Sequence, residues 1–451
     1  MKKKQIFFLE QSEGDDCVYI KSHLGKYLTV DGDGKFLGSG EGQGEEEAML
    51  IEPQADGSWA IKSKKYGWYC GGSGEDLSAF VKEIDTTKIW TVHLAMHPQI
   101  NLRNVMRKAY CHMDKGGESF ATDEVVPWGE DATITLHFNT EDGTYGLVAA
   151  DGQFLTATGA LGANDENAKF IIEFQGGQVS FKAKGSGKYV TALGAKGTLK
   201  ASEASITKDE QFVMEDSFPQ IALHSKNGKY VSTKQGVELA AFADTITNNA
   251  IFQVEPLDDN GNWAIKSSVP KYWNLDGVSV QATETDSSAA TSSFAIEWRG
   301  AQIALKASNG KYVAQMMNNY LHANVDEATE ENGGVFTYEV VNRPRLVLRG
   351  EFGFVGTLPS GLLECNKSAP EIYTMVVHDG KVQISHANGK FWKVGSNGVS
   401  CSGTAAEDYA IELYDNSMLC LKMGDKYFQG AQNGAFTLTG TKADKSTHFE
   451  Y

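Results

Sequence analysis

One short pattern recurs along the chain of 451 residues and limits the fold more than any other feature of the sequence. It consists of two apolar residues separated by one residue, a polar turn with glycine, and a lysine followed by an aromatic residue. Clear copies run from Ile221 to Tyr230 and from Ile303 to Tyr312. The aromatic residues that end these turns follow one another at intervals of 35 to 44 residues: Tyr27, Tyr69, Tyr110, Phe154, Tyr189, Tyr230, Tyr272, Tyr312, Phe354, Phe391 and Tyr427. A period of this length is typical of an architecture built from repeated units.

Each copy of the pattern predicts a β-hairpin. Alternating apolar residues place every second side chain on one face of a strand, and glycine supplies the positive φ of a tight turn. We expect the aromatic residue to begin the return strand and to pack inward. A second strand signal, usually ending in glutamate, falls between the turns, as in Leu50-Ile51-Glu52 and Ile171-Ile172-Glu173. Each unit therefore holds about four short strands, and the sequence predicts an all-β protein.

Proline-containing breaks group the units in threes. Pro98, Pro219 and Pro344 are 121 and 125 residues apart, and each interval holds three units. Three four-stranded units around a threefold axis form a β-trefoil, whose closed barrel removes exposed strand edges. A propeller of the WD40 type has a similar period, but its Gly-His and Trp-Asp signature is absent.

The sequence therefore predicts four tandem β-trefoil domains, the first lacking its opening repeat unit. Their expected boundaries are 1–96, 97–217, 218–341 and 342–451. The incomplete first domain should be the least stable, because its barrel leaves strand edges unpaired. Short proline-containing linkers should hold the domains together as a semi-rigid body.

Charge and cysteine content narrow the function class. A net charge of −17 disfavours a general binder of nucleic acids or anionic membranes. The sequence has no apolar signal-peptide core and no run of 18 apolar residues. Its six cysteines are scattered without a C-x-x-C pair, so we expect reduced thiols in a cytoplasmic protein.

Several local motifs resemble the fascin family of actin-bundling proteins, and the resemblance extends from Lys2 to Tyr451. The motifs are Trp90-Thr91-Val92-His93-Leu94-Ala95-Met96-His97-Pro98-Gln99, Val126-Pro127-Trp128-Gly129, Gly197-Thr198-Leu199-Lys200-Ala201, Ile296-Glu297-Trp298-Arg299, Asn342-Arg343-Pro344 and Arg349-Gly350-Glu351. The resemblance implies a monomer that is not an enzyme and needs no cofactor. Its partner would be filamentous actin, which more than one site would cross-link into parallel bundles. It also implies the cytoplasm and the cytoskeleton of actin-rich protrusions, with no nucleic-acid binding and no membrane insertion.

The resemblance also suggests which residues contact the filament. Filaments are acidic, so basic side chains are the natural contacts. The candidates are Lys2, Lys3, Lys4, Arg107, Lys108, Arg343, Arg349 and Glu351. The alternative for each of them is an ordinary solvated charge at a turn.

Departures from the family pattern keep other functions open. Met316-Met317 stand where the family has a lysine pair, and Phe352 where it has a histidine. The family carries a basic residue near Leu358, and a lysine and a histidine in place of Gln429 and Gln432. The opening unit would have carried a regulatory serine and further basic residues. A fascin-like scaffold that has lost efficient bundling and binds another protein is therefore an alternative, whereas a carbohydrate-binding trefoil would need the Gln-x-Trp repeat that is absent.

Other patterns have structural explanations. His93 and His97 have the spacing of two zinc ligands on a helix, but they lie in a segment that reads as strand and proline turn, so no metal site is expected. Asp31-Gly32-Asp33-Gly34 lacks the later ligands of a calcium loop. The Gly38–Gly44 stretch precedes three glutamates, which oppose phosphate binding. Trp59 and Trp263, each in a Trp-Ala-Ile-Lys-Ser segment, should pack in barrel cores.

Overall fold

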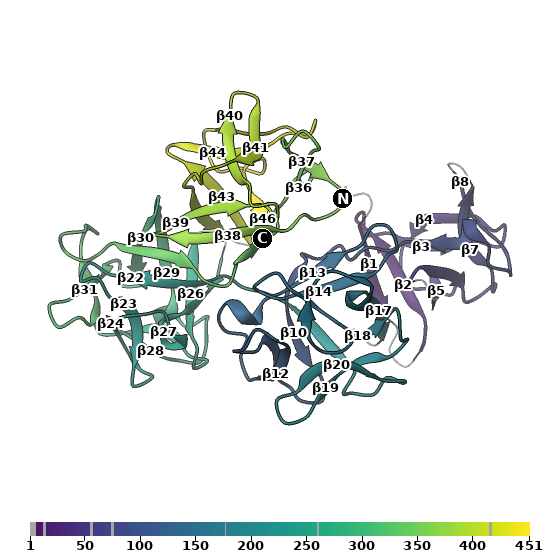
Figure 1. Ribbon diagram of the computed structural model, residues 1–451, viewed down its shortest axis with the longest axis horizontal. Coiled ribbons are helices and arrows are strands. Elements are labelled where there is room, and N and C mark those ends of the chain that lie inside the picture. The colour runs from purple at the N-terminus through teal and green to yellow at the C-terminus, as the bar shows by residue number, and fades with distance from the viewer. Residues whose placement is uncertain are drawn as a thin grey trace.

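The computed structural model describes residues 6–11, 15–54, 57–73, 76–175, 177–258, 261–414 and 417–451. These residues form 46 strands and short 3₁₀ helices of three residues each, so the predicted all-β fold class is confirmed. The 3₁₀ helices are η2 (Thr86–Lys88), η3 (Glu130–Ala132), η4 (Glu166–Ala168), η5 (Asn248–Ala250) and η6 (Ala290–Ser292). The strands gather into four lobes in chain order (Figure 1).

The first lobe is a single sheet and the second lobe is another. The strands of the first lobe are β1 (Phe7–Gln11), β2 (Val18–Ser22), β3 (Tyr27–Val30), β4 (Phe36–Gly40), β5 (Ala48–Pro53), β6 (Trp59–Ser63), β7 (Tyr69–Ser73), β8 (Asp76–Val81) and β9 (Ile89–Trp90). Those of the second lobe are β10 (Gln99–Asn104), β11 (Tyr110–Met113), β12 (Phe120–Glu124), β13 (Ile134–Phe138), β14 (Tyr145–Val148), β15 (Phe154–Leu155), β16 (Leu161–Gly162), β17 (Phe170–Gln175), β18 (Gln178–Ala183), β19 (Tyr189–Leu193), β20 (Thr198–Glu203) and β21 (Phe212–Asp216).

The third lobe is also one sheet, whereas the fourth is divided into two. The strands of the third lobe are β22 (Gln220–His224), β23 (Tyr230–Lys234), β24 (Glu238–Ala243), β25 (Phe252–Pro256), β26 (Asn262–Ser267), β27 (Tyr272–Asp276), β28 (Ser279–Glu284), β29 (Phe294–Arg299), β30 (Gln302–Ala307), β31 (Tyr312–Gln315), β32 (Leu321–Val325) and β33 (Phe336–Val340). Those of the fourth lobe are β34 (Arg345–Leu346), β35 (Arg349–Gly350), β36 (Gly353–Thr357), β37 (Leu363–Lys367), β38 (Tyr373–His378), β39 (Lys381–Ser385), β40 (Phe391–Gly395), β41 (Gly398–Gly403), β42 (Ala410–Tyr414), β43 (Met418–Met423), β44 (Lys426–Gly430), β45 (Phe436–Gly440) and β46 (Phe449–Glu450). The domain boundaries after residues 96, 217 and 341 stay predictions.

Strand pairing in the third lobe shows how a complete lobe closes. The opening strand β22 pairs on one side with β25 and on the other with the last strand, β33. The β24, β28 and β32 strands meet at the other end, where Glu238 pairs with Gln281 and Ser279 with His322. This is a barrel closed by first and last strands and capped by three hairpins, as expected of a β-trefoil.

The described part of the first lobe has no strand that corresponds to β22 of the third. Among its described residues, β1 pairs with β2 alone and β9 with β6 alone. The pairing of β1 has the same register as that of β25, because Phe7 faces Ser22 as Phe252 faces Ser267. The described strands of the first lobe thus correspond to β25–β33 of the third, while the absence of an opening unit stays a prediction.

The turn-end aromatic residues occupy a recurrent β-bulge. The register of the return strand shifts directly after Tyr189, Tyr230, Tyr272 and Tyr312, among others. A bulge redirects the side chains that follow it. The next residue (Val190, Val231, Trp273 or Val313) is therefore fully buried in the core, while three of these four tyrosine rings remain half-buried. The expectation that the aromatic residue itself packs inward holds for Tyr27, Tyr69, Tyr189 and Phe354. It is wrong at those three positions and at four others that are also half-buried: Tyr110, Phe154, Phe391 and Tyr427.

A second interaction explains why these tyrosines are so regular. The Tyr189 hydroxyl donates a hydrogen bond of 2.8 Å to Glu173, and the Lys182 ammonium group lies 5.3 Å from the centre of the Tyr189 ring. The glutamate is the one that ends the second strand signal of the unit. The same arrangement recurs in Tyr27, Glu10 and Lys21, in Tyr69, Glu52 and Lys62, in Tyr272, Glu255 and Lys266, and in Tyr427, Glu412 and Lys422.

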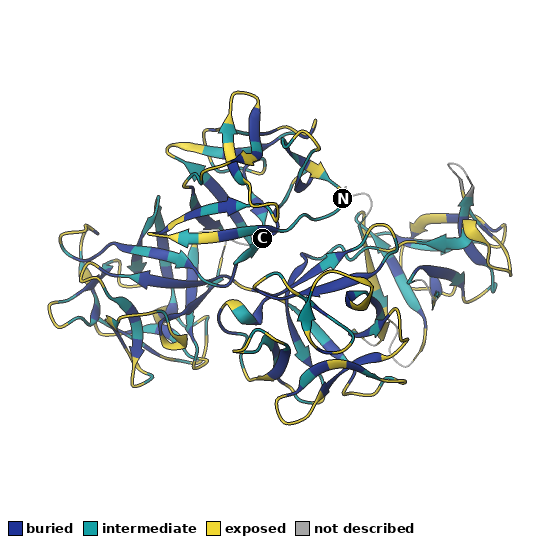
Figure 2. Cartoon of the chain, viewed as in Figure 1, coloured by how far each residue is buried: buried dark blue, intermediate teal, exposed yellow. Residues whose placement is uncertain are grey.

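Burial follows the lobes, as the dark-blue strand interiors of Figure 2 show. The third and fourth lobes share one continuous hydrophobic cluster, whereas the first and second have separate clusters. Trp263 lies in the shared cluster, as expected. Trp59 instead packs against Phe174 of the second lobe at a ring distance of 6.0 Å.

Candidate functional site

A basic pair stands at a turn of the second lobe. Arg107 and Lys108 lie between β10 and β11, where Lys108 adopts a positive φ of 55°. The Arg107 amide donates to Asn104 Oδ1 over 2.9 Å, and the Lys108 amide donates to the Asn104 carbonyl over 2.9 Å. The turn therefore holds both side chains at the surface of the lobe.

The two side chains of this pair do different things. The Arg107 guanidinium donates hydrogen bonds to the carbonyl oxygens of Ala192, Gly194 and Ala195, 85 to 88 residues away in the sequence. Lys108 is exposed, and its ammonium group forms none of the ion pairs found among the described residues. Lys108 can therefore meet a partner directly, whereas Arg107 is already engaged within the lobe.

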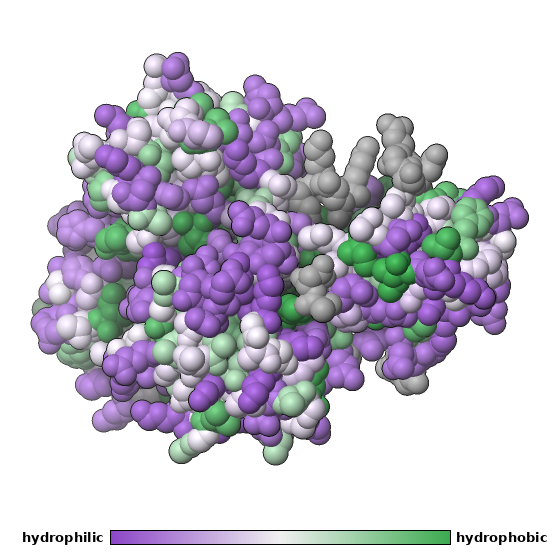
Figure 3. Space-filling view, turned by 45° about the vertical axis from the view of Figure 1, so that its right-hand side comes forward, coloured by the Kyte–Doolittle hydropathy of each residue, from purple (hydrophilic) through white to green (hydrophobic). Residues whose placement is uncertain are grey.

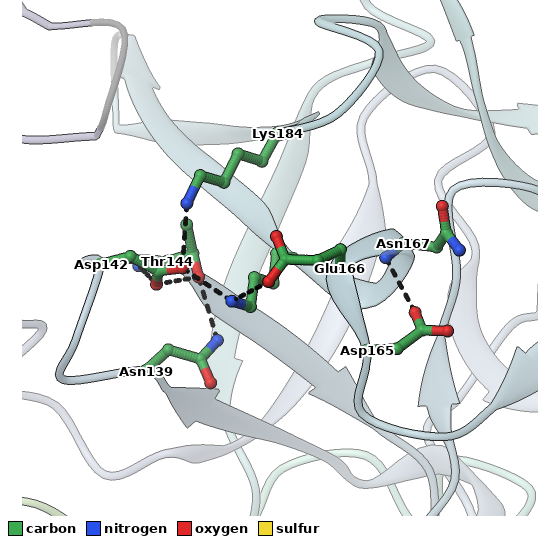
Figure 4. Close-up of polar contacts among 8 residues, drawn as sticks. Asn139, Asp142, Thr144, Asp165, Glu166, Asn167 and Lys184 are labelled. Atoms are coloured by element: carbon green, nitrogen blue, oxygen red, sulfur yellow. Dashed lines mark hydrogen bonds and ion pairs between the residues drawn. The ribbon is translucent and has the colours of Figure 1, made fainter.

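Other lysines of the second lobe are neutralised by carboxylates (Figure 4). Asp142 accepts from Lys169 over 2.9 Å and from Lys184 over 3.0 Å, and it also accepts from the Thr144 hydroxyl. Burial alone would raise the pKa of Asp142, but these hydrogen bonds hold that pKa well below its usual range. Lys169 and Lys184 are therefore engaged within the lobe, unlike Lys108.

The structure removes Arg343 from the set of filament contacts. Its side chain is only 1% exposed, at the junction of the second, third and fourth lobes. It donates to the Ser217 carbonyl over 2.5 Å and lies 5.3 Å from the centre of the Tyr451 ring. The predicted surface role is therefore wrong, because a buried side chain cannot touch a filament.

Arg349 and Glu351 lie at the edge of the fourth lobe. Arg349 forms an ion pair with Glu450 and donates to the Ala95 carbonyl in the segment that joins the first two lobes. Its side chain is mostly buried, so it holds the junction together. Glu351 is exposed and Phe352 is half-buried at the adjacent turn.

The remaining sequence candidates are dispersed. Lys2, Lys3 and Lys4 lie outside the described residues. Met317 is fully exposed at a turn of the third lobe. Gln429 is held within the fourth lobe by a 2.9 Å hydrogen bond from its amide to the Ser446 hydroxyl. The structure does not gather the described candidates into one site, since they lie on different lobes.

The histidine pair forms no metal site in the described part of the chain. No group of three metal-ligating side chains lies together among those residues. The His93 and Phe138 rings are tilted by 43° with their centres 4.0 Å apart, and His97 binds the Val347 carbonyl over 3.1 Å. A hollow of about 30 Å³ beside His93, Phe138 and Pro370 has room for roughly one water molecule. No described helix is long and apolar enough to cross a membrane.

Comparison with known proteins identifies the family. The family model described as the Fascin domain matches four successive segments, 1–92, 100–214, 226–338 and 351–451. The chain belongs to the fascin family. It is 37% identical to Fascin-2 of Bos taurus over 442 residues, and the aligned region covers 96% of this chain and 89% of that protein. Over 472 residues it is 30% identical to the Fascin of Strongylocentrotus purpuratus, covering all of this chain and 93% of that protein. Fascin-3 of Mus musculus is 23% identical over 454 residues, covering 99% of this chain and 90% of that protein.

Sequence reasoning missed the partner segment of Arg107. Residues 192–195 follow a predicted hairpin, and nothing in the sequence pattern connects them to a turn 85 residues earlier. The one signal available was the glycine of the Gly197-Thr198-Leu199 motif. A Cβ at Gly197 would approach the Arg107 guanidinium carbon to 3.0 Å.

Proposed function

We propose that this fascin binds actin filaments and cross-links them into parallel bundles. It would act as a monomer in the cytoplasm and the cytoskeleton of actin-rich protrusions, without catalysis, cofactor, nucleic acid or membrane insertion. The observation that supports the proposal most is family membership along the whole chain, with 37% identity to a Fascin-2. The interlobe contacts add a physical reason, because a rigid body with several weak sites binds best when filaments lie side by side.

The proposed contacts are on separate lobes. Lys108, placed by the Arg107 turn, would serve one filament from the second lobe. Lys2, Lys3 and Lys4 at the start of the chain, and the exposed edge of the fourth lobe at Glu351 beside Arg349, would serve others. Basic side chains suit the acidic filament, and their contribution should fall as salt rises.

Charge reversal at the second lobe tests the proposal. Changing Arg107 and Lys108 together to glutamate should reduce bundling more than single-filament binding, because one of several sites is lost. Low-speed sedimentation with actin filaments measures bundles, and high-speed sedimentation measures single-filament binding. Lys188→Glu is the control, since Lys188 is another exposed lysine of the same lobe.

Each outcome of this experiment has a clear reading. A double variant that bundles like Lys188→Glu would reject the second-lobe site. A wild-type protein that fails to pellet with filaments at either speed would reject the proposed function itself.

A fascin-like scaffold for another protein is the second candidate, favoured by one apolar surface. At the cap of the third lobe, Met317 is fully exposed, and Phe242 and Tyr320 pack edge to face at 5.9 Å. The Lys234 ammonium group lies 5.0 Å from the centre of each ring. Exposed apolar clusters of this kind are typical of protein contacts. Absence of actin binding together with intact folding would favour this candidate.

A further inference from the structure

The contacts of Arg107 point to a basic residue that neither the sequence motifs nor the proposed contacts include. The loop between β19 and β20 carries Lys196, which is exposed. Arg107 binds three carbonyl oxygens at the start of this loop, at Ala192, Gly194 and Ala195. The residue directly after the last of these carbonyls is Lys196. The Arg107 side chain thus fixes this loop beside the turn that presents Lys108.

The loop is also fixed from its other side. The Lys196 carbonyl accepts a 2.8 Å hydrogen bond from the Thr122 amide of β12. Gly197 has a φ of 63°, and a Cβ there would lie 2.8 Å from the Thr122 carbonyl oxygen. The backbone of the loop therefore has little freedom, while the Lys196 side chain extends into solvent.

Comparison with other lobes shows that the fold does not require lysine at this position. The same amide-to-carbonyl bond joins Ala241 to Asn319 in the third lobe and Cys365 to Gly434 in the fourth. In each lobe the donor lies in the return strand of one hairpin and the acceptor lies in a neighbouring hairpin turn. Lysine, asparagine and glycine can each accept this hydrogen bond, because only the backbone carbonyl takes part in it. The side chain at this position is therefore free to serve binding.

The charges around Lys196 leave its ammonium group available. Two acidic residues, Asp123 and Glu124, follow Thr122 in β12. Asp123 already accepts a 2.7 Å hydrogen bond from His112. Glu124 is exposed and pairs with Tyr110 across the strands. Lys196 and Lys108 form none of the ion pairs found among the described residues.

We propose that Lys196 and Lys108 form one two-lysine contact for the acidic surface of an actin filament, and that Arg107 is the positioning residue that holds the two segments together. This inference rests on the proposed function and adds to it a residue and a division of roles. Two lysines on backbone segments that are already held together bind an acidic surface better than one, because the segments need no ordering relative to each other on binding.

Single neutral substitutions test the inference. Lys196→Gln should weaken filament binding by about three- to fivefold, the range expected for one solvent-exposed charge contact. Lys108→Gln should weaken it similarly, and Lys188→Gln should leave it unchanged. Co-sedimentation over a range of salt concentrations measures all three, and the first two variants should show a shallower salt dependence than wild type. Thermal unfolding should be the same for all of them.

A double variant tests the role of Arg107. If Arg107 acts by placing the loop, Lys196→Gln should have little further effect on binding once Arg107→Gln has been introduced. If Arg107 touches the filament independently, the two effects should multiply, which would overturn the positioning role.

The outcomes separate this inference from the function on which it rests. Wild-type protein that binds filaments, with Lys196→Gln binding equally well, overturns the two-lysine contact alone. Wild-type protein that does not bind filaments overturns the proposed function and the inference with it.

Discussion

His97 shows how burial sets the chemistry of a single residue. Its Nε2 atom donates to the Val347 carbonyl over 3.1 Å, and its Nδ1 atom accepts from the Gln99 amide over 3.3 Å. Both contacts suit the neutral ring. Burial, together with the nearby Arg343 and Arg349 charges, lowers the pKa of His97 to about 3. The ring therefore holds the junction between the second and fourth lobes without becoming charged.

This lowered pKa predicts a loss of stability in acid. The unfolded chain binds a proton at His97 below about pH 6.5, whereas the folded chain does not until about pH 3. The neutral His97 ring therefore stabilises the fold fully above pH 6.5. Below that pH, the free energy of unfolding should fall by up to about 1.4 kcal/mol per pH unit. Urea unfolding between pH 7 and pH 4 measures this slope.

A variant isolates His97 from the other histidines whose pKa is lowered by burial, such as His93 and His137. His97→Gln keeps a hydrogen-bond donor and cannot titrate. Its free energy of unfolding should fall less steeply with decreasing pH than that of the wild type. An equal pH dependence in the two proteins would show that His97 is not responsible for it.

At the scale of the element, equivalent strands of different lobes have very different surroundings. Phe7 and Leu9 of β1 are 43% and 44% exposed, whereas Phe252 and Val254, which have the same register in β25, are fully buried. Figure 3 shows apolar surface on the first lobe, at the right-hand side of the view. Both strands carry apolar residues at these two alternating positions, but β25 also pairs with β22, whereas among the described strands β1 pairs with β2 alone.

Hydrogen exchange should detect this difference. Among the described strands, β1 has a partner on one side only, and its residues have less apolar cover, so its amide groups should exchange faster than those of β25. Mass spectrometry of exchanged peptides from 7–22 and 252–267 makes the comparison. Equal protection in the two segments would show that the first lobe is as stable as the third.

At the scale of the whole molecule, the lobes are not four equal modules. The third and fourth share a hydrophobic cluster that includes Trp273 and Trp392, and the Tyr338 hydroxyl of the third donates to the Ile411 carbonyl of the fourth. The second lobe has its own cluster around Phe170 and Phe181. A shared core couples the unfolding of the parts that form it.

Calorimetry should therefore show the third and fourth lobes unfolding in one transition. Tyr338→Phe leaves the Ile411 carbonyl without its buried donor and should lower the stability of that transition by about 1–3 kcal/mol. Tyr66→Phe, in the first lobe, should leave it unchanged. Two separate transitions for these lobes would contradict the shared core.

The sequence predicted what is local and repeated, and it failed where distant segments meet. The period of the hairpins and their alternation are carried by neighbouring residues, so the all-β class could be predicted. Arg343 looked like a surface charge because Ser217, the residue that buries it, is 126 positions away. The carbonyls that engage Arg107 are equally remote, so its positioning role could not be predicted from the turn alone. The prediction that the turn tyrosines pack inward failed at several positions, because the alternation of apolar and polar residues does not reveal where a β-bulge shifts the register.

The uneven sharing of cores has a mechanical consequence. A protein that cross-links two filaments, as proposed for this one, carries tension along its own length. The junction between the third and fourth lobes, which share one continuous hydrophobic cluster, would deform little under such tension. The first lobe would yield earlier, because β1 pairs with one strand alone in the described part of the chain, and antiparallel strands can separate one hydrogen bond at a time. The molecule would then be stiff at its third and fourth lobes and more compliant at its first, so a bundle held by it as proposed would fail first at the first lobe.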